Sequence, residues 1–168
     1  MKQLVGFYLL FFILASSVYG QDTTGVRSDQ IPSTDLRTLE GGVINTRDLL
    51  SDTVPVVLAF WATWCRPCLR ELSAIHDAMP DWDEEANFRI VAVSIDDART
   101  TNMVRNLVNA RGWEFEVYLD PNSDFRTLMN VAQPPHTFVF YRGEIVYQHT
   151  SYAEGDEEEL FEVIKKHQ

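Results

Sequence analysis

The stretch WATWCRPCLREL, residues 61–72, decides the fold of this 168-residue chain. It continues an apolar run at 54–61 (VPVVLAFW) that is rich in branched residues, a composition typical of a strand buried on both faces. From 68 to 79 the apolar residues recur at helical spacing. The sequence therefore predicts that Cys65 lies where a buried strand passes into a helix, with Cys68 one turn inside that helix.

The position of the two cysteines predicts their chemistry. Free N–H groups and the positive end of the helix dipole favour a thiolate on Cys65, and Arg66 adds a positive neighbour. Pro67 is tolerated in the first turn of a helix. Cys68 should be more buried, and it is placed to attack a mixed disulfide formed on Cys65. These features favour a redox-active pair.

Two other roles for the cysteines are less consistent with the sequence. As a structural staple, a disulfide across so short a loop contributes only about 2 kcal/mol. A zinc site needs two further ligands, and the chain has no second cysteine pair; only His76 and His136, at no zinc-like spacing, remain to be recruited. We therefore expect no metal site, and a copper- or zinc-binding module is kept as the alternative function.

The first twenty residues predict export. Lys2 precedes an apolar run at 4–15, and Val18 and Gly20 are the small residues at −3 and −1 if cleavage falls before Gln21. An uncleaved membrane tether is the alternative, although the run is short for a span of about 20 residues. We expect a signal peptide at 1–20, a flexible lead-in at 21–32, and location in the periplasm or another extracytoplasmic compartment.

Composition limits the remaining possibilities. With 25 Asp and Glu against 14 Lys and Arg, the formal charge is −11, and no basic cluster is available to neutralise phosphates, so nucleic acid is not an expected partner. The 45% hydrophobic content supports a buried core. The length fits one folded domain at 33–168, which we expect to be a monomer.

Two blocks of the sequence resemble those of a known family. The block FWATWCxPC at 60–68 is similar to the active site of the thioredoxin superfamily, specifically the extracytoplasmic TlpA/ResA-type thiol–disulfide oxidoreductases. VAQPPHTF at 131–138 is similar to the family segment V-x-x-x-P-T-x-F, whose proline is cis and packs against the disulfide, which implies that role for Pro135. The likeness extends from about Ser33 to the C-terminus.

The resemblance implies a function. It implies a Cys65–Cys68 dithiol–disulfide cycle without another cofactor, acting on disulfide-bearing extracytoplasmic proteins and supplied with electrons by a membrane thiol donor, with cytochrome c maturation as the associated process. Metal-carrying proteins of this fold usually have CxxxC and a distant His. A peroxidase of the fold would need P-x-x-x-T-x-x-C, but Thr63 is only two residues before Cys65.

The rest of the chain agrees with an α/β thioredoxin fold, in which a mixed central sheet is flanked by helices on both faces. A β-hairpin extension is expected at 34–45 around a Gly-Gly turn. Further strands are expected at 88–95, 114–119, 137–141 and 144–148, and further helices at 98–110, near 123–130 and at 157–166. Asp96 or Asp97 is the expected cap of the helix at 98–110.

One departure from thioredoxins bears on mechanism. Thioredoxins carry a buried Asp, the proton acceptor for the inner cysteine, where this chain has Ala59. Glu71 lies one helical turn after Cys68 on the same side, and ResA-like proteins have a Glu at the matching place. We expect Glu71 to assist the thiols; a solvated surface Glu is the alternative.

The resemblance also places substrate-contacting residues around the cysteines. Trp64, Arg66 and Pro67 are expected to face a bound substrate. Pro134, before the cis-proline, has no N–H, so the substrate should lose one main-chain hydrogen bond, worth about 1 kcal/mol. His136 either tunes cysteine reactivity or simply begins a strand.

Overall fold

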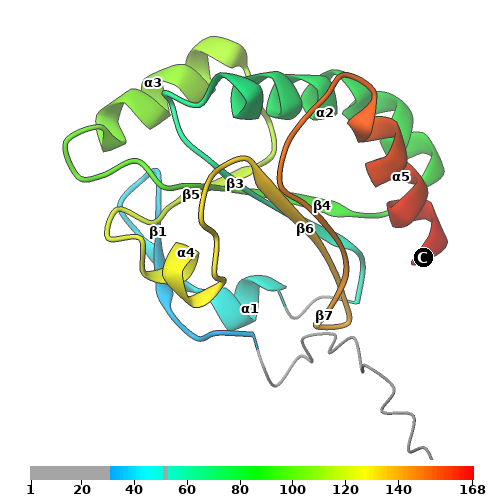
Figure 1. Cartoon of the computed structure of the whole chain (residues 1–168), viewed down its shortest axis with the longest axis horizontal. Coiled ribbons are helices and arrows are strands. Elements are labelled where there is room, and N and C mark those ends of the chain that lie inside the picture. The colour runs from blue at the N-terminus through cyan, green and yellow to red at the C-terminus, as the bar shows by residue number, and fades with distance from the viewer. Residues whose placement is uncertain (1–30, 51–52) are drawn as a thin grey trace, which may run out of the picture.

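The computed structural model describes residues 31–50 and 53–168, and in this part of the chain the centre is a seven-stranded mixed sheet (Figure 1). The strand order is β2-β1-β5-β4-β3-β6-β7. β3, β4 and β5 pair in parallel, and the other neighbours pair antiparallel. The strands are β1 (Asp35–Thr38), β2 (Val43–Asn45), β3 (Val56–Trp61), β4 (Arg89–Ser94), β5 (Glu116–Leu119), β6 (His136–Tyr141) and β7 (Glu144–His149).

Helices cover both faces of the sheet. They are α1 (Thr46–Leu50), α2 (Arg66–Glu85), α3 (Thr101–Arg111), α4 (Asp124–Leu128) and α5 (Asp156–Lys166). In Figure 1, α2, α3 and α5 lie over one face, and α1 and α4 lie under the other. Because β3, β4 and β5 follow one another in a single direction across the sheet, right-handed crossovers place α2 and α3 on the same face. The expected thioredoxin fold and its N-terminal hairpin are confirmed.

The apolar run at 54–61 contains β3, an interior strand of the sheet. Every residue of β3 is buried, because β4 and β6 flank it and helices cover both of its faces. Burial on both faces explains why this run is continuously apolar rather than alternating.

The helix after the cysteines is longer than its sequence pattern predicts. α2 continues six residues beyond Met79 and contains Pro80, which ends the apolar spacing seen in the sequence. Trp82 explains the continuation: it is buried, and its ring stacks on Phe161 of α5 with centroids 4.8 Å apart. Tertiary packing thus outweighs the cost of a proline inside the helix.

Two other expectations on helices need correction. α3 begins at Thr101, three residues later than predicted, because Asp97 closes a turn at 97–100 before the helix starts. α1 was not predicted at all. It is a single turn, and its one buried polar residue, Thr46, donates a hydrogen bond to the Pro32 carbonyl.

The packed domain starts at or before Ile31. This residue is 1% exposed, and its carbonyl accepts a hydrogen bond from Arg47 at 3.1 Å, so packing begins two residues before the expected boundary at Ser33. The predicted signal peptide and residues 21–30 of the lead-in lie outside the described residues. Across residues 31–50 and 53–168, no helix has the length and apolar character needed to cross a membrane.

Candidate active site

Strand register brings the sequence motifs to one end of the sheet. In the pairing of β3 with β6, Phe60 lies opposite His136. The loop that leads to Cys65 leaves β3 just beyond Phe60, and the Pro134–Pro135 dipeptide enters β6 just before His136. The Pro134–Pro135 bond is cis, as the resemblance implies. The cysteine motif and the proline motif, seventy residues apart in sequence, therefore lie at the same end of the neighbouring strands β3 and β6.

The two cysteines form a disulfide at the start of α2. Cys65 is the N-cap of the helix, and its Sγ accepts a hydrogen bond from the Cys68 N–H at 3.3 Å. Cys68 is completely buried, whereas Cys65 keeps 5% of its surface exposed. Once the pair is reduced, the same helix terminus favours a thiolate on Cys65, the accessible sulfur.

Asp96 has a role that its sequence position did not indicate. It is 1% exposed and caps no helix; its carboxylate accepts hydrogen bonds from Thr63 N at 2.8 Å, Thr63 Oγ1 at 2.6 Å and Ser94 Oγ at 2.8 Å. Asp97 does not cap α3 either, so the expected cap is wrong. The N-cap is Thr100, with no side-chain hydrogen bond, and the Asp97 carboxylate accepts from Arg99 N at 2.9 Å and Thr100 N at 3.2 Å in the turn before the helix. A buried carboxylate with three donors is stabilised in place, so Asp96 anchors the loop that precedes Cys65.

Glu71 is buried rather than solvated. Only 2% of its surface is exposed, and its Oε1 accepts hydrogen bonds from Thr137 Oγ1 at 2.6 Å and from His149 Nε2 at 2.8 Å. The surface alternative for Glu71 is therefore wrong. Sequence reasoning missed His149, which is 78 residues away and carries no motif; only the strand register brings it here.

His136 begins β6 with its ring against the core. The ring stacks on Phe138 with centroids 4.2 Å apart, and burial lowers the pKa of His136 below its usual value. This placement confirms the simpler of the two sequence interpretations, that His136 starts a strand. Its lowered pKa favours a neutral ring at physiological pH.

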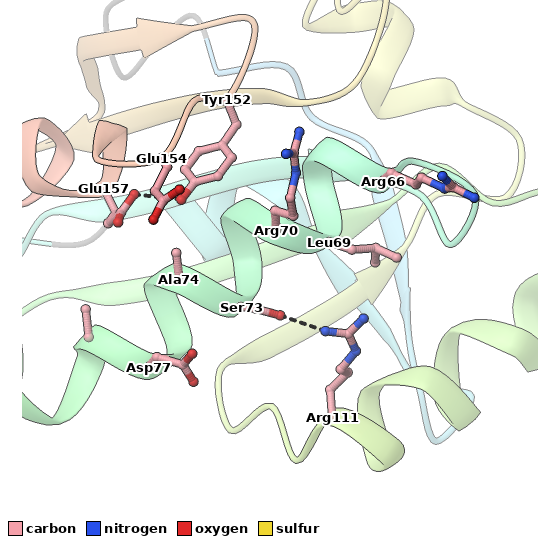
Figure 2. A pocket seen from close by; sticks show the side chains of 11 residues that line it. Arg66, Leu69, Arg70, Ser73, Ala74, Asp77, Arg111, Tyr152, Glu154 and Glu157 are labelled. Atoms are coloured by element: carbon pink, nitrogen blue, oxygen red, sulfur yellow. Dashed lines mark hydrogen bonds between the residues drawn. The ribbon is translucent and has the colours of Figure 1, made fainter.

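A groove runs along α2 from Arg66, the residue that follows Cys65 (Figure 2), and has a volume of about 1000 Å³. Arg66, Arg70 and Arg111 lie toward the start of the helix, and Glu154 and Glu157 lie toward its middle. Arg111 is held there by its hydrogen bond to Ser73, at 3.0 Å. The expected substrate-contacting residue Arg66 thus forms one end of a charged groove.

The other substrate-contacting candidates differ in exposure. Trp64 is 62% exposed, which is unusual for so large an apolar side chain, while Pro67 and Pro134 are half-buried. A large exposed aromatic residue next to a reactive sulfur is suited to contact a partner.

The described residues contain no ligand set that would support the metal-binding alternative. No group of three His, Cys, Asp or Glu side chains there is arranged to hold an ion. His76 packs against Phe115 and lies 3.6 Å from Asp77 instead of joining the cysteines.

Comparison with known proteins agrees with this geometry. The model of the AhpC/TSA family matches residues 28–149. The thiol-disulfide oxidoreductase ResA of Bacillus thuringiensis is 30% identical over 129 residues, which cover 76% of this chain and 70% of that protein. ResA of Halalkalibacterium halodurans is 31% identical, covering 77% and 72% respectively.

Solved structures give the same result. An uncharacterized thioredoxin-like protein from Porphyromonas gingivalis has a TM-score of 0.72 at 42% identity, over 82% of this chain and 90% of that one. A putative thiol:disulfide interchange protein DsbE from Chlorobium tepidum has a TM-score of 0.70 at 27% identity, over 82% and 94%.

Proposed function

The chain belongs to the AhpC/TSA family and is a thiol–disulfide oxidoreductase of the ResA/DsbE type, and from this premise we propose that it reduces disulfides in proteins outside the cytoplasm. Cys65 and Cys68 carry the electrons, and the disulfide they form is the only redox group required. The predicted signal peptide supports an extracytoplasmic location, either released or tethered if the signal is retained.

The reductive cycle has two sulfur exchanges. The Cys65 thiolate attacks one sulfur of the substrate disulfide, forming a mixed disulfide and releasing the other substrate sulfur as a thiolate that takes a proton. Cys68 then gives its proton to Glu71 and attacks the Cys65 sulfur. The second substrate thiolate leaves and takes the proton held by Glu71. Two electrons therefore pass from the protein to the substrate, with one proton from Cys68 and one from the solvent that received the Cys65 proton on ionisation.

The burial of Glu71 is the observation that carries the direction of electron flow. A strong oxidant of this fold is one whose reduced form is stabilised. A buried carboxylate one turn from Cys68 does the opposite, because it repels a thiolate there. The reduced protein should therefore give up its electrons readily.

The substrate should bind across the exposed edge of the site. Trp64, Arg66 and Pro67 would contact it on the cysteine side, and Pro134 and His136 on the side of the cis-proline. Because Pro134 donates no N–H, the substrate chain forms one main-chain hydrogen bond fewer than in relatives without this proline. A membrane thiol donor would return the protein to its reduced form, and substrates of cytochrome c maturation fit the ResA resemblance.

The reduction potential tests the proposed direction. Equilibration of the full chain with glutathione and with thioredoxin at pH 7 should give a value below that of the glutathione pool, nearer the value of about −270 mV for thioredoxin. A potential close to the value of about −120 mV for a strong oxidant would overturn the reductase proposal and leave the protein as a disulfide donor.

A further inference from the structure

Glu71, which lies one turn after Cys68 on α2, and His149 of β7 form a pair that is almost excluded from solvent. The Glu71 side chain is 3% exposed and the His149 side chain 16%. Thr137 lies directly opposite His149 in the pairing of β6 with β7, so both side chains reach the face of the sheet that α2 covers. Their two hydrogen bonds end on the same oxygen of Glu71, Oε1.

This arrangement has an electrostatic consequence. Burial alone favours the protonated form of a carboxyl group, whereas hydrogen bonds donated to it favour the ionised form. Thr137 supplies one donor and His149 the other. Among the described residues, Oε2 of Glu71 receives no hydrogen bond, so this oxygen remains available to take a proton.

Glu71 and Tyr147 contact the two ring nitrogens of His149, and because an ionised carboxylate can only accept, the nitrogen that faces Glu71 must carry the hydrogen. The Tyr147 hydroxyl lies 3.2 Å from Nδ1 of His149. Burial, together with the acids Glu159, Asp156 and Glu71, raises the pKa of Tyr147, so the hydroxyl keeps its proton and can donate it to Nδ1. A neutral His149 then carries its hydrogen on Nε2, where it faces Glu71.

We propose that His149 is a positioning residue for the oxidoreductase reaction: it holds the Glu71 carboxylate ionised and in place, so that Glu71 can accept the proton of Cys68. The inference rests on the proposed function of Glu71 as the proton acceptor. The proton passes from Cys68 Sγ to Glu71 Oε2, while His149 keeps its hydrogen bond to Oε1.

The charges around the pair explain why its behaviour must be measured across pH. His136 on β6 and Tyr147 on β7 lie within electrostatic reach of Glu71, as does Tyr152 before α5. The acids on this side are Glu154, Asp156, Glu157 and Glu159. A positive charge on His149 would turn its hydrogen bond to Glu71 into an ion pair and weaken Glu71 as a base.

A reaction that releases a coloured thiolate in two phases measures the reactivity of Cys65 and Cys68 separately. The reduced full chain is mixed by stopped flow with one equivalent of 5,5′-dithiobis(2-nitrobenzoate), from pH 5.5 to 9. The first coloured thiolate reports attack by Cys65, and the second reports attack by Cys68 on the mixed disulfide. His149→Val removes the donor, His149→Gln keeps an N–H but cannot be protonated, and His76→Gln is the matched histidine control on α2.

The three variants should differ in the rate of the second phase. His149→Val slows the second phase by about tenfold at pH 7, with the deficit shrinking as pH rises, and leaves the first phase within about twofold. His149→Gln recovers most of the second phase at pH 7 to 8 and loses less of its rate than wild type below pH 6. His76→Gln matches wild type in both phases.

Other patterns overturn the proposal. If His149→Val leaves the second phase unchanged, or slows both phases equally, His149 does not act through Glu71. If His149→Gln fails to recover the rate, the hydrogen bond is not the relevant contact. Two other results would contradict the proposed function itself. A normal second phase in Glu71→Gln would show that Glu71 is not the proton acceptor. The absence of a first phase in wild type would show that Cys65 is not the nucleophile.

Discussion

The Asp96 carboxylate accepts two hydrogen bonds from Thr63, one from the backbone N–H at 2.8 Å and one from the hydroxyl at 2.6 Å. Thr63 lies two residues before Cys65, and the Cys65 N–H in turn donates to the Ala62 carbonyl at 3.0 Å. The loop between β3 and α2 is therefore fixed from the end of β4. The position of the nucleophile depends on a carboxylate that is not itself part of the redox motif.

The first prediction concerns this anchor. Asp96→Asn replaces one acceptor oxygen by a donor, so one of the three donors around it loses its partner. We expect a loss of about 1–3 kcal/mol in the free energy of unfolding, measured with urea on the oxidised protein. Thr63→Val removes only the hydroxyl and should cost about 1 kcal/mol. Equal stability of Asp96→Asn and wild type would contradict the anchoring role.

The second prediction assigns the two thiols. Cys65 should react with iodoacetamide well below pH 8 because it caps α2, and Cys68 should react slowly because it is fully buried. Cys65→Ser should abolish turnover, and Cys68→Ser should accumulate mixed disulfides through Cys65. Mass spectrometry of the labelled peptides gives the answer, and equal labelling of both thiols at pH 6 would reverse the assignment.

Local patterns predicted the parts of the fold that depend on neighbours in sequence. The apolar run of β3, the hairpin at the N-terminus and the helix start at Cys65 each have a periodicity or a turn signal. The missed features depend on residues far apart. The sequence predicted Asp96 as a possible helix cap because nothing local indicates its contact with Thr63, which is on another loop. The helix α2 continues past Pro80 because Trp82 packs on Phe161.

The same distinction applies to the candidate site. The cysteines and Pro135 carry motifs, and Glu71 has a fixed spacing from Cys68. His149 has neither, since its contact with Glu71 requires the register of β6 with β7. A residue of this kind becomes visible only when the pairing of the strands is known.

The third prediction concerns acid stability. Burial lowers the pKa of His136, so the folded protein binds its proton less readily than the unfolded chain. The stabilisation is complete above the usual His value of about 6.5 and is lost as pH falls toward the lower folded value. We expect His136→Phe, which keeps a ring on Phe138, to lose less in Tm than wild type between pH 7.5 and 5. If both proteins lose the same amount in Tm over this pH range, His136 does not contribute to the acid sensitivity of the fold.

Ala59, Thr137 and His149 form a row across three strands. Ala59 pairs with Thr137 between β3 and β6, and Thr137 pairs with His149 between β6 and β7. Residues paired in this way project from the same face, and Glu71 of α2 bonds to two of the three. In thioredoxins an Asp occupies the position of Ala59 on β3. Here the carboxylate that contacts this row is that of Glu71, which comes from α2.

The last prediction follows from this row. Cys68 must lose its proton in an apolar pocket, where burial disfavours the thiolate, and general-base assistance is commonly worth about 10²–10⁴-fold. We expect Glu71→Gln to keep the fold and to slow insulin reduction at least about tenfold near pH 7, with the deficit shrinking toward pH 9. Adding Ala59→Asp should recover part of the rate, because its carboxylate would enter the same row beside Thr137. Superimposable pH profiles of wild type and Glu71→Gln would show that the proton leaves Cys68 by another route, and a double variant no faster than Glu71→Gln would show that a carboxylate at position 59 cannot reach it.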